Sequence, residues 1–96
     1  MSCLHTINKA PSAQLLNSCS NTLQKGDAIL FIEDGIYHAL ETALPEFIPE
    51  GVAIYALRED ICARGLQEKC QEFVEIIAYR NFVELCVEHD KVVSWF

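Results

Sequence analysis

The chain has 96 residues, a length that predicts a single domain over residues 1–96. Seven basic residues stand against fourteen acidic ones, and this net charge of −7 argues against direct binding of nucleic acid, because phosphate contacts come from Lys and Arg. Hydrophobic residues make up 51% of the chain, which is high for a domain this small, so part of the apolar surface is expected to lie in a subunit interface.

Strands and helices are predicted to alternate from the N-terminus onward. Residues 2–6 form a first strand, and a helix opens at Pro11 and Ser12. The apolar face of this helix is formed by Leu15, Leu16, Cys19 and Leu23. Residues 28–32 are all apolar and lie between Gly26-Asp27 and Glu33-Asp34-Gly35, a pattern typical of a strand covered on both faces in a parallel sheet.

The same alternation continues in the second half of the chain. A short helix is predicted at residues 36–44 and ends at Pro45. A strand at 52–56 and a helical turn at 59–64 follow, then a strand at 73–77 and a helix at 81–89. The apolar tail, residues 92–96, is expected to be packed or paired. This order predicts an α/β fold, a three-layer α/β/α sandwich around a mostly parallel sheet of four to five strands.

The sequence contains no motif of a common enzyme class. Its four glycines are isolated, so it has neither a GxGxxG nor a Walker loop, and no CxxC pair is present. We therefore expect no cofactor and no metal. Cys3 and His5 face the same side of the first strand and could supply half of a metal site, but a buried thiol beside a hydrogen-bonded imidazole is the favoured interpretation.

Five cysteines, an odd number without paired spacing, are expected to be reduced. Cys19 is the weak candidate for a catalytic residue, because a thiolate can accept and pass on sulfur. Its place on the apolar helix face favours a core role instead, and Cys86 is also predicted to be a core residue. Cys62 and Cys70 lie in more polar segments, where oxidation is plausible but no activating base is apparent.

Six polar residues are expected near the carboxyl edge of the sheet, where open α/β proteins usually bind ligands and partners. They are His5, Asn8, Glu33, Asp34, Asp60 and Arg64. They either form a polar binding site or have structural roles, and we favour the structural interpretation. For Asp34 we predict a carboxylate that accepts backbone N–H groups at the start of the following helix.

Four blocks of sequence, in order from end to end of the chain, resemble the DsrH/TusB family. They are LHTINKAP at 4–11, GDAILFIEDG at 26–35, LREDICARG at 57–65, and YRNFVELCVEH at 79–89 followed by Trp95. The resemblance implies a DsrEFH-like fold and a place in a sulfur-relay complex. Some DsrH members carry a cysteine seven residues before the GD motif, where this chain has Cys19, whereas TusB members often have an apolar residue there.

In the relay that the resemblance implies, this subunit associates with TusC/DsrF-like and TusD/DsrE-like subunits in a dimer of heterotrimers. Persulfide sulfur passes from a TusA-like donor toward a TusE-like acceptor for 2-thiolation of the wobble uridine in tRNA. In the DsrEFH-type complex of sulfur-oxidising bacteria the acceptor is DsrC-like. In both complexes the main sulfur-carrying cysteine belongs to the TusD/DsrE-like subunit.

The sequence therefore predicts a non-catalytic or accessory subunit of a sulfurtransferase complex, with the TusBCD type favoured. No segment is apolar for the ~18 residues that span a membrane and no secretory signal is visible, so we expect the cytoplasm and no membrane contact. One alternative is a DsrEFH-type subunit with Cys19 as a sulfur-carrying thiol. Others are a stand-alone thiol enzyme or redox sensor that uses Cys19 or Cys62, and a small-ligand-binding module at the carboxyl edge of the sheet.

Overall fold

A computed structural model describes residues 2–95, apart from the side chain of Ala13. The elements in chain order are β1 (Cys3–Ile7), α1 (Ala13–Ser20), β2 (Ala28–Phe31), the 3-10 helices η1 (Glu33–Leu40) and η2 (Leu44–Phe47), β3 (Ala53–Leu57), α2 (Arg58–Ala63), β4 (Glu75–Ile77), α3 (Tyr79–Glu88) and β5 (Lys91–Trp95). Among these helices none combines the length and the apolarity needed to cross a lipid bilayer.

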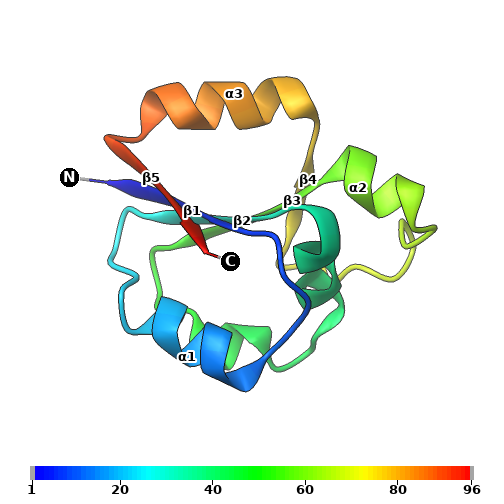
Figure 1. Cartoon of the computed structure of the whole chain (residues 1–96), viewed down its shortest axis with the longest axis horizontal. Coiled ribbons are helices and arrows are strands. Elements are labelled where there is room, and N and C mark those ends of the chain that lie inside the picture. The colour runs from blue at the N-terminus through cyan, green and yellow to red at the C-terminus, as the bar shows by residue number, and fades with distance from the viewer. Residues whose placement is uncertain (1, 96) are drawn as a thin grey trace.

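The sheet of the described chain has five strands in the order β4-β3-β2-β1-β5, and every pair of neighbours is parallel. Helix α3 covers one face, and α1 lies across the other (Figure 1). The predicted α/β fold with a parallel sheet between helical layers is confirmed. The apolar tail is β5, which pairs with β1 from Cys3–Lys91 to Ile7–Trp95. Phe96, also part of the predicted tail, lies outside the described residues.

Strand β2 separates two hydrophobic cores, because successive side chains of a strand point to opposite faces. Ile29 and Phe31 lie in the larger core, under α1 and the 3-10 helices. Ala28 and Leu30 lie in the smaller core, under α3. All four side chains are at most 1% exposed, which confirms the prediction of a strand covered on both faces.

The predicted helix at 36–44 is wrong in its type and its bounds. The chain turns directly after β2 at Glu33, whose φ is +51°, and η1 follows as a 3-10 helix over Glu33–Leu40. Gly35 N donates to the carbonyl of Ile32, a bond that spans three residues. Pro45 does not end a helix but lies in the first turn of η2, where its missing N–H costs no hydrogen bond.

Candidate functional site

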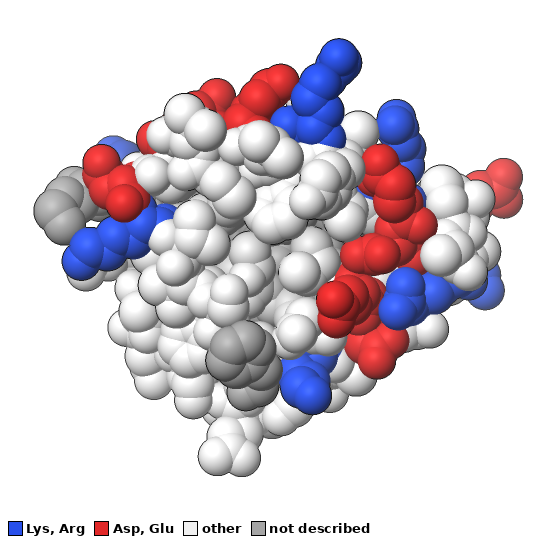
Figure 2. Space-filling view, turned by 45° about the horizontal axis from the view of Figure 1, so that its top comes forward, with Lys and Arg blue, Asp and Glu red and all other residues white. Residues whose placement is uncertain are grey.

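Side chains of α2 connect the carboxyl edge of the sheet to the helices around it. Asp60 Oδ2 accepts the backbone N–H of Glu33 at 2.6 Å, at the start of η1. Arg64 Nη2 donates to Asp34 Oδ1 at 3.1 Å, and its Nη1 donates to the carbonyl of Asp60 at 3.2 Å. The structure therefore brings together four of the six predicted edge residues. In Figure 2 acidic side chains and cations lie beside one another on the right of the molecule, the side of α2 in Figure 1.

The predicted role of Asp34 is wrong. Its carboxylate is 64% exposed and bonds Arg64, while the first N–H of η1 is taken by Asp60 from another element. The reason is geometric, since η1 begins at Glu33 and leaves Asp34 inside its first turn. Glu59 acts in the same way as Asp60 at α3, where its Oε2 accepts the N–H of Tyr79 at 3.2 Å. This hydrogen bond lowers the pKa of Glu59.

Removing Asp60 is expected to destabilise the fold more than removing Asp34. Asp60→Ala leaves the N–H of Glu33 without its acceptor, at a cost of about 0.5–2 kcal/mol in the free energy of unfolding. Asp34→Ala removes an ion pair at the surface, which contributes about 0–1 kcal/mol. Urea unfolding of the two variants measures both, with Asp60→Asn as the control that keeps an oxygen acceptor. A larger loss for Asp34→Ala than for Asp60→Ala would contradict this assignment.

The expectation that His5 approaches the carboxyl edge is also wrong. His5 is buried, and its Nε2 lies 3.2 Å from Oδ2 of Asp27, the residue directly before β2 at the opposite end of the strand. Trp95 Nε1 donates to His5 Nδ1 at 3.1 Å. Because an indole N–H can only donate, Nδ1 accepts and Nε2 carries the hydrogen that Asp27 receives. The favoured hydrogen-bonded imidazole is thus confirmed, while the neighbouring Cys3 thiol is only half-buried.

Asp27 is a buried carboxylate with three hydrogen-bond donors. Besides His5, the backbone N–H of Cys3 donates to Oδ1 at 2.9 Å and that of Gln24 to Oδ2 at 3.0 Å. Burial opposes ionisation of this carboxyl, but the three donors outweigh it and hold the pKa of Asp27 below its ordinary value. With both nitrogens of His5 engaged, the pair Cys3 and His5 has no free imidazole nitrogen to offer a metal. Within residues 2–95 no three His, Cys, Asp or Glu side chains are grouped to hold one.

Cys19 lies in the larger core between α1 and the sheet, as its place on the apolar helix face predicted. Its side chain is 1% exposed, and burial raises its pKa to about 12, with a smaller contribution from Cys3. Burial likewise raises the pKa of Cys70. Cys86 is half-buried and packs against the smaller core, so its predicted core position is met in part. Cys62 is exposed on α2.

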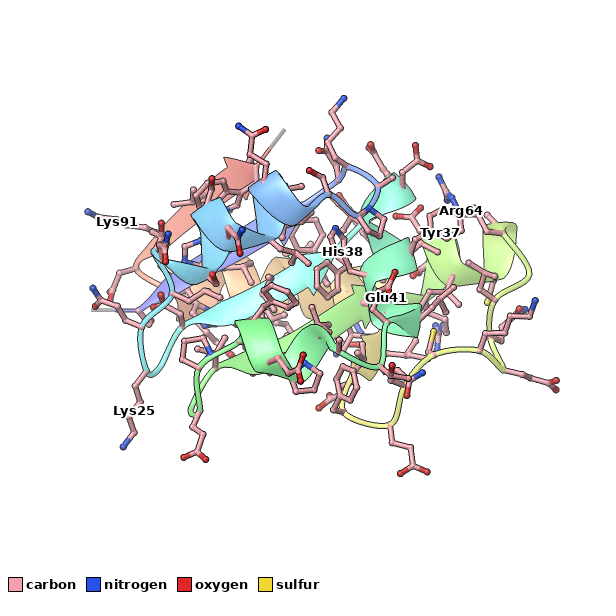
Figure 3. The ribbon with its side chains drawn as sticks, turned by 90° about the horizontal axis from the view of Figure 1, so that it is seen from below. Lys25, Tyr37, His38, Glu41, Arg64 and Lys91 are labelled. Carbon is pink, nitrogen blue, oxygen red and sulfur yellow. The ribbon has the colours of Figure 1, made fainter. Side chains whose placement is uncertain are left out.

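Sequence reasoning did not single out His38, a polar side chain that the fold buries. His38 of η1, labelled in Figure 3, is fully buried. Its ring stacks on Phe31 with centroids 4.9 Å apart. Neither of its ring nitrogens has a hydrogen-bond partner within the described residues, nor does Asn8 Oδ1. Burial lowers the pKa of His38. The backbone of Lys9 and the charge of Glu41 act to raise this pKa, but burial has the larger effect. No motif marks His38, because its neighbours come from β2 and the loop after β1.

A groove of about 430 Å³ lies at the carboxyl end of β5, beside the start of α1. It is lined by Lys9, Ala10, Ser12, Gln14, Leu15, Ser18 and Trp95. Neither the polar cluster around Asp60 nor Cys19 contributes to this lining. This groove, the polar cluster and the Cys19 thiol are therefore separate features of the described chain.

The family model described as "DsrH like protein" matches residues 9–92. The chain belongs to the DsrH/TusB family. Protein TusB of Photorhabdus laumondii is 40% identical over 94 residues, which cover 96% of this chain and 99% of that protein. Protein TusB of Escherichia coli is 31% identical over the same shares of the two chains. The resemblance carried by the four sequence blocks is confirmed.

Solved structures show the same fold at low sequence identity. The crystal structure of the ychN protein from E. coli superposes with a TM-score of 0.78 at 14% identity, over 99% of both chains. The solution structure of Tm0979 from Thermotoga maritima has a TM-score of 0.69 at 23% identity, over 90% of this chain and 92% of that one. Within the DsrH/TusB family this chain is a TusB-like subunit of the sulfur relay, a role that implies 2-thiouridine synthesis in tRNA.

Proposed function

We propose that this TusB-like chain is an accessory, non-catalytic subunit of a cytoplasmic TusBCD-type complex. Its sister subunits are TusC/DsrF-like and TusD/DsrE-like, and a cysteine of the TusD/DsrE-like sister carries the sulfur. The complex receives persulfide sulfur from a TusA-like donor and passes it to a TusE-like acceptor, for 2-thiolation of the wobble uridine in tRNA. The similarity to TusB proteins over 96% of the chain is the observation that carries this proposal.

The environment of Cys19 supports an accessory role. A relay thiol has to be reached by the persulfide of another protein and has to ionise near neutral pH. Cys19 is 1% exposed, and burial raises its pKa to about 12, so its thiol stays protonated near neutral pH. Both properties disfavour the alternative in which Cys19 itself carries sulfur.

The net charge of the chain also supports an accessory role. With fourteen acidic and seven basic residues it lacks the excess of Lys and Arg that phosphate contacts require. Contact with tRNA is therefore assigned to another protein of the pathway. The role left to this chain is to hold its sisters in an active arrangement.

Assembly with the two sister subunits is the direct test. Co-expression of the tagged chain with TusC-like and TusD-like proteins is expected to yield one complex that contains all three, held by interfaces of at least about 1,200 Å². Affinity purification followed by size-exclusion chromatography measures this, with an unrelated tagged α/β protein as the control. A chain that elutes alone in the presence of both sisters contradicts the proposal.

The function of Cys19 is tested by its replacement in the assembled complex. Cys19→Ser and Cys19→Ala are expected to leave the rate of sulfur transfer within a few-fold of wild type, because the thiol is buried and protonated. Loss of the TusD-like cysteine is expected to abolish transfer. The measurement is passage of labelled persulfide sulfur from a TusA-type donor to a TusE-type acceptor. Abolished transfer by both Cys19 variants in a normally assembled complex would make this chain a relay station itself.

A further inference from the structure

The helical layer on the α3 side of the sheet is incomplete. Val92 of β5 lies beside Leu4 of β1 in register, so both side chains point to the α3 face. Leu4 is fully buried in the smaller core, whereas Val92 is 46% exposed. Among the described elements, α3 is the helix that lies over this face of the sheet (Figure 1). Parallel sheets are normally covered on both faces. The β5 side of this face is therefore open for a further element.

Helix α3 has more apolar surface than the sheet covers. Leu85 is buried, and Phe82 and Cys86 pack beside it on the smaller core. A further row at four-residue spacing, Tyr79, Val83 and Val87, is 57%, 49% and 81% exposed. We call this row together with Val92 the apolar shelf.

A polar flank of α3 borders the apolar row on the side nearer to β4. Asn81, Glu84 and Glu88 line a groove of about 270 Å³ shared with Tyr55 and with Glu75 of β4. Tyr79, Val83 and Val87 do not line this groove, so the apolar row lies beside the polar flank and outside the groove. Figure 2 shows a broad surface free of Lys, Arg, Asp and Glu, with both acidic and basic side chains along its upper border.

Charge decides between the possible occupants of the shelf. Beside the exposed row, α3 carries two acidic residues, Glu84 and Glu88, and one basic residue, Arg80. Burial raises the pKa of Tyr55, and Glu75 and Glu88 raise it further, as expected in an acidic groove. A second copy of this chain would bring another net charge of −7 to the same border. A partner with Lys or Arg beside its apolar face would gain from these acids.

We propose that the apolar shelf is the docking surface for a helix of one sister subunit, whose apolar face covers Tyr79, Val83, Val87 and Val92 and whose Lys or Arg side chains meet Glu84 and Glu88. This inference rests on the proposed membership of a TusBCD-type complex. The docked helix completes the layer that α3 leaves open. It also accounts for part of the apolar surplus of the sequence.

The test is the affinity of the chain, in solution, for its co-purified TusC-like and TusD-like sisters. The double variant Val83→Glu/Val87→Glu changes only exposed positions of α3, so its thermal unfolding is expected to resemble wild type, while its Kd rises at least about tenfold. Glu84→Lys/Glu88→Lys is expected to weaken binding too, and more so at low salt. The matched control is Tyr37→Glu, which charges another exposed apolar residue, on η1, and is expected to leave the Kd within about twofold.

Each of the following outcomes would overturn the proposed docking site. Wild-type affinity in the Val83→Glu/Val87→Glu variant overturns the docking site while leaving the complex itself intact. Equal weakening by Tyr37→Glu overturns it as well, because the effect would not be specific to the shelf. A homodimer of the isolated chain that dissociates on Val87→Glu assigns the shelf to a second copy instead. Failure of the wild-type chain to bind either sister overturns the proposed function together with this site.

Discussion

Gly35→Ala is expected to lower the free energy of unfolding by about 3 kcal/mol or more, a large loss for the addition of one methyl group. A Cβ at this position would lie 1.9 Å from the carbonyl oxygen of Ile7 and 2.7 Å from its carbonyl carbon. Both are backbone atoms at the end of β1. That oxygen also accepts the N–H of Ile32 at 3.0 Å. The end of β1 therefore cannot move away from the added methyl group without breaking this hydrogen bond.

The displacement would act on η1 and on the larger core. Ile36, which follows Gly35, is fully buried, and His38 stacks on Phe31 two residues later. Moving η1 outward by the distance that the methyl group needs would expose these contacts to water. We therefore expect a lower urea midpoint, together with a loss of near-ultraviolet signal from the aromatic core.

The matched control is Gly65→Ala. Gly65 has a φ of +67° and nothing within 4 Å of its would-be Cβ, so alanine there meets backbone strain without a steric clash. The left-handed conformation is expected to cost about 1–2 kcal/mol. Urea unfolding of the two variants compares the cost of a steric clash at Gly35 with the cost of backbone strain at Gly65. If Gly35→Ala loses no more free energy of unfolding than Gly65→Ala, the close packing of η1 on β1 is contradicted.

Asp27→Ala is expected to cost about 3 kcal/mol or more, because it leaves three donors without their acceptor, each at a cost of about 1–3 kcal/mol. The backbone N–H groups of Cys3 and Gln24 and the Nε2 of His5 all donate to this carboxylate. Without it His5 is held only by Trp95, and the connection between the starts of β1 and β2 is lost. Asp90→Ala is the matched control, since Asp90 also accepts a backbone N–H, that of Ser2, but in an exposed position. It is expected to cost about 1 kcal/mol.

The lowered pKa of Asp27 predicts how the stability of the fold depends on pH. The folded state holds its pKa below the ordinary value of 3.8, so the unfolded chain takes up this proton first as the pH falls. The stabilisation is complete above about pH 5 and is lost as the pH falls through the folded pKa. Urea unfolding between pH 7 and pH 2 is expected to show a shallower acid loss in Asp27→Asn than in wild type. An identical slope in both proteins would show that Asp27 does not contribute to it.

Local patterns in the sequence were sufficient for most of the fold. The short apolar run at residues 28–32 predicted a strand buried on both faces, because only such a strand needs apolar residues at every position, and β2 occupies Ala28–Phe31 of it. The alternation of elements predicted the parallel sheet, and the apolar face of α1 predicted the burial of Cys19. These features depend on the order and the spacing of residues, which the chain carries by itself. Four blocks of sequence likewise identified the family.

Only the tertiary structure decided which side chains meet. Asp27 reaches His5, and His5 reaches Trp95 across 90 positions, because β1 lies between β2 and β5 in the sheet. Asp60, not Asp34, receives the N–H of Glu33, because α2 packs beside η1. Gly35 lies close against the end of β1, and apolar side chains of α3 and β5 stay exposed only because the fold leaves them uncovered. Spacing along the chain determines which face a residue shares with its neighbours, whereas strand order and packing distance determine what that face contacts.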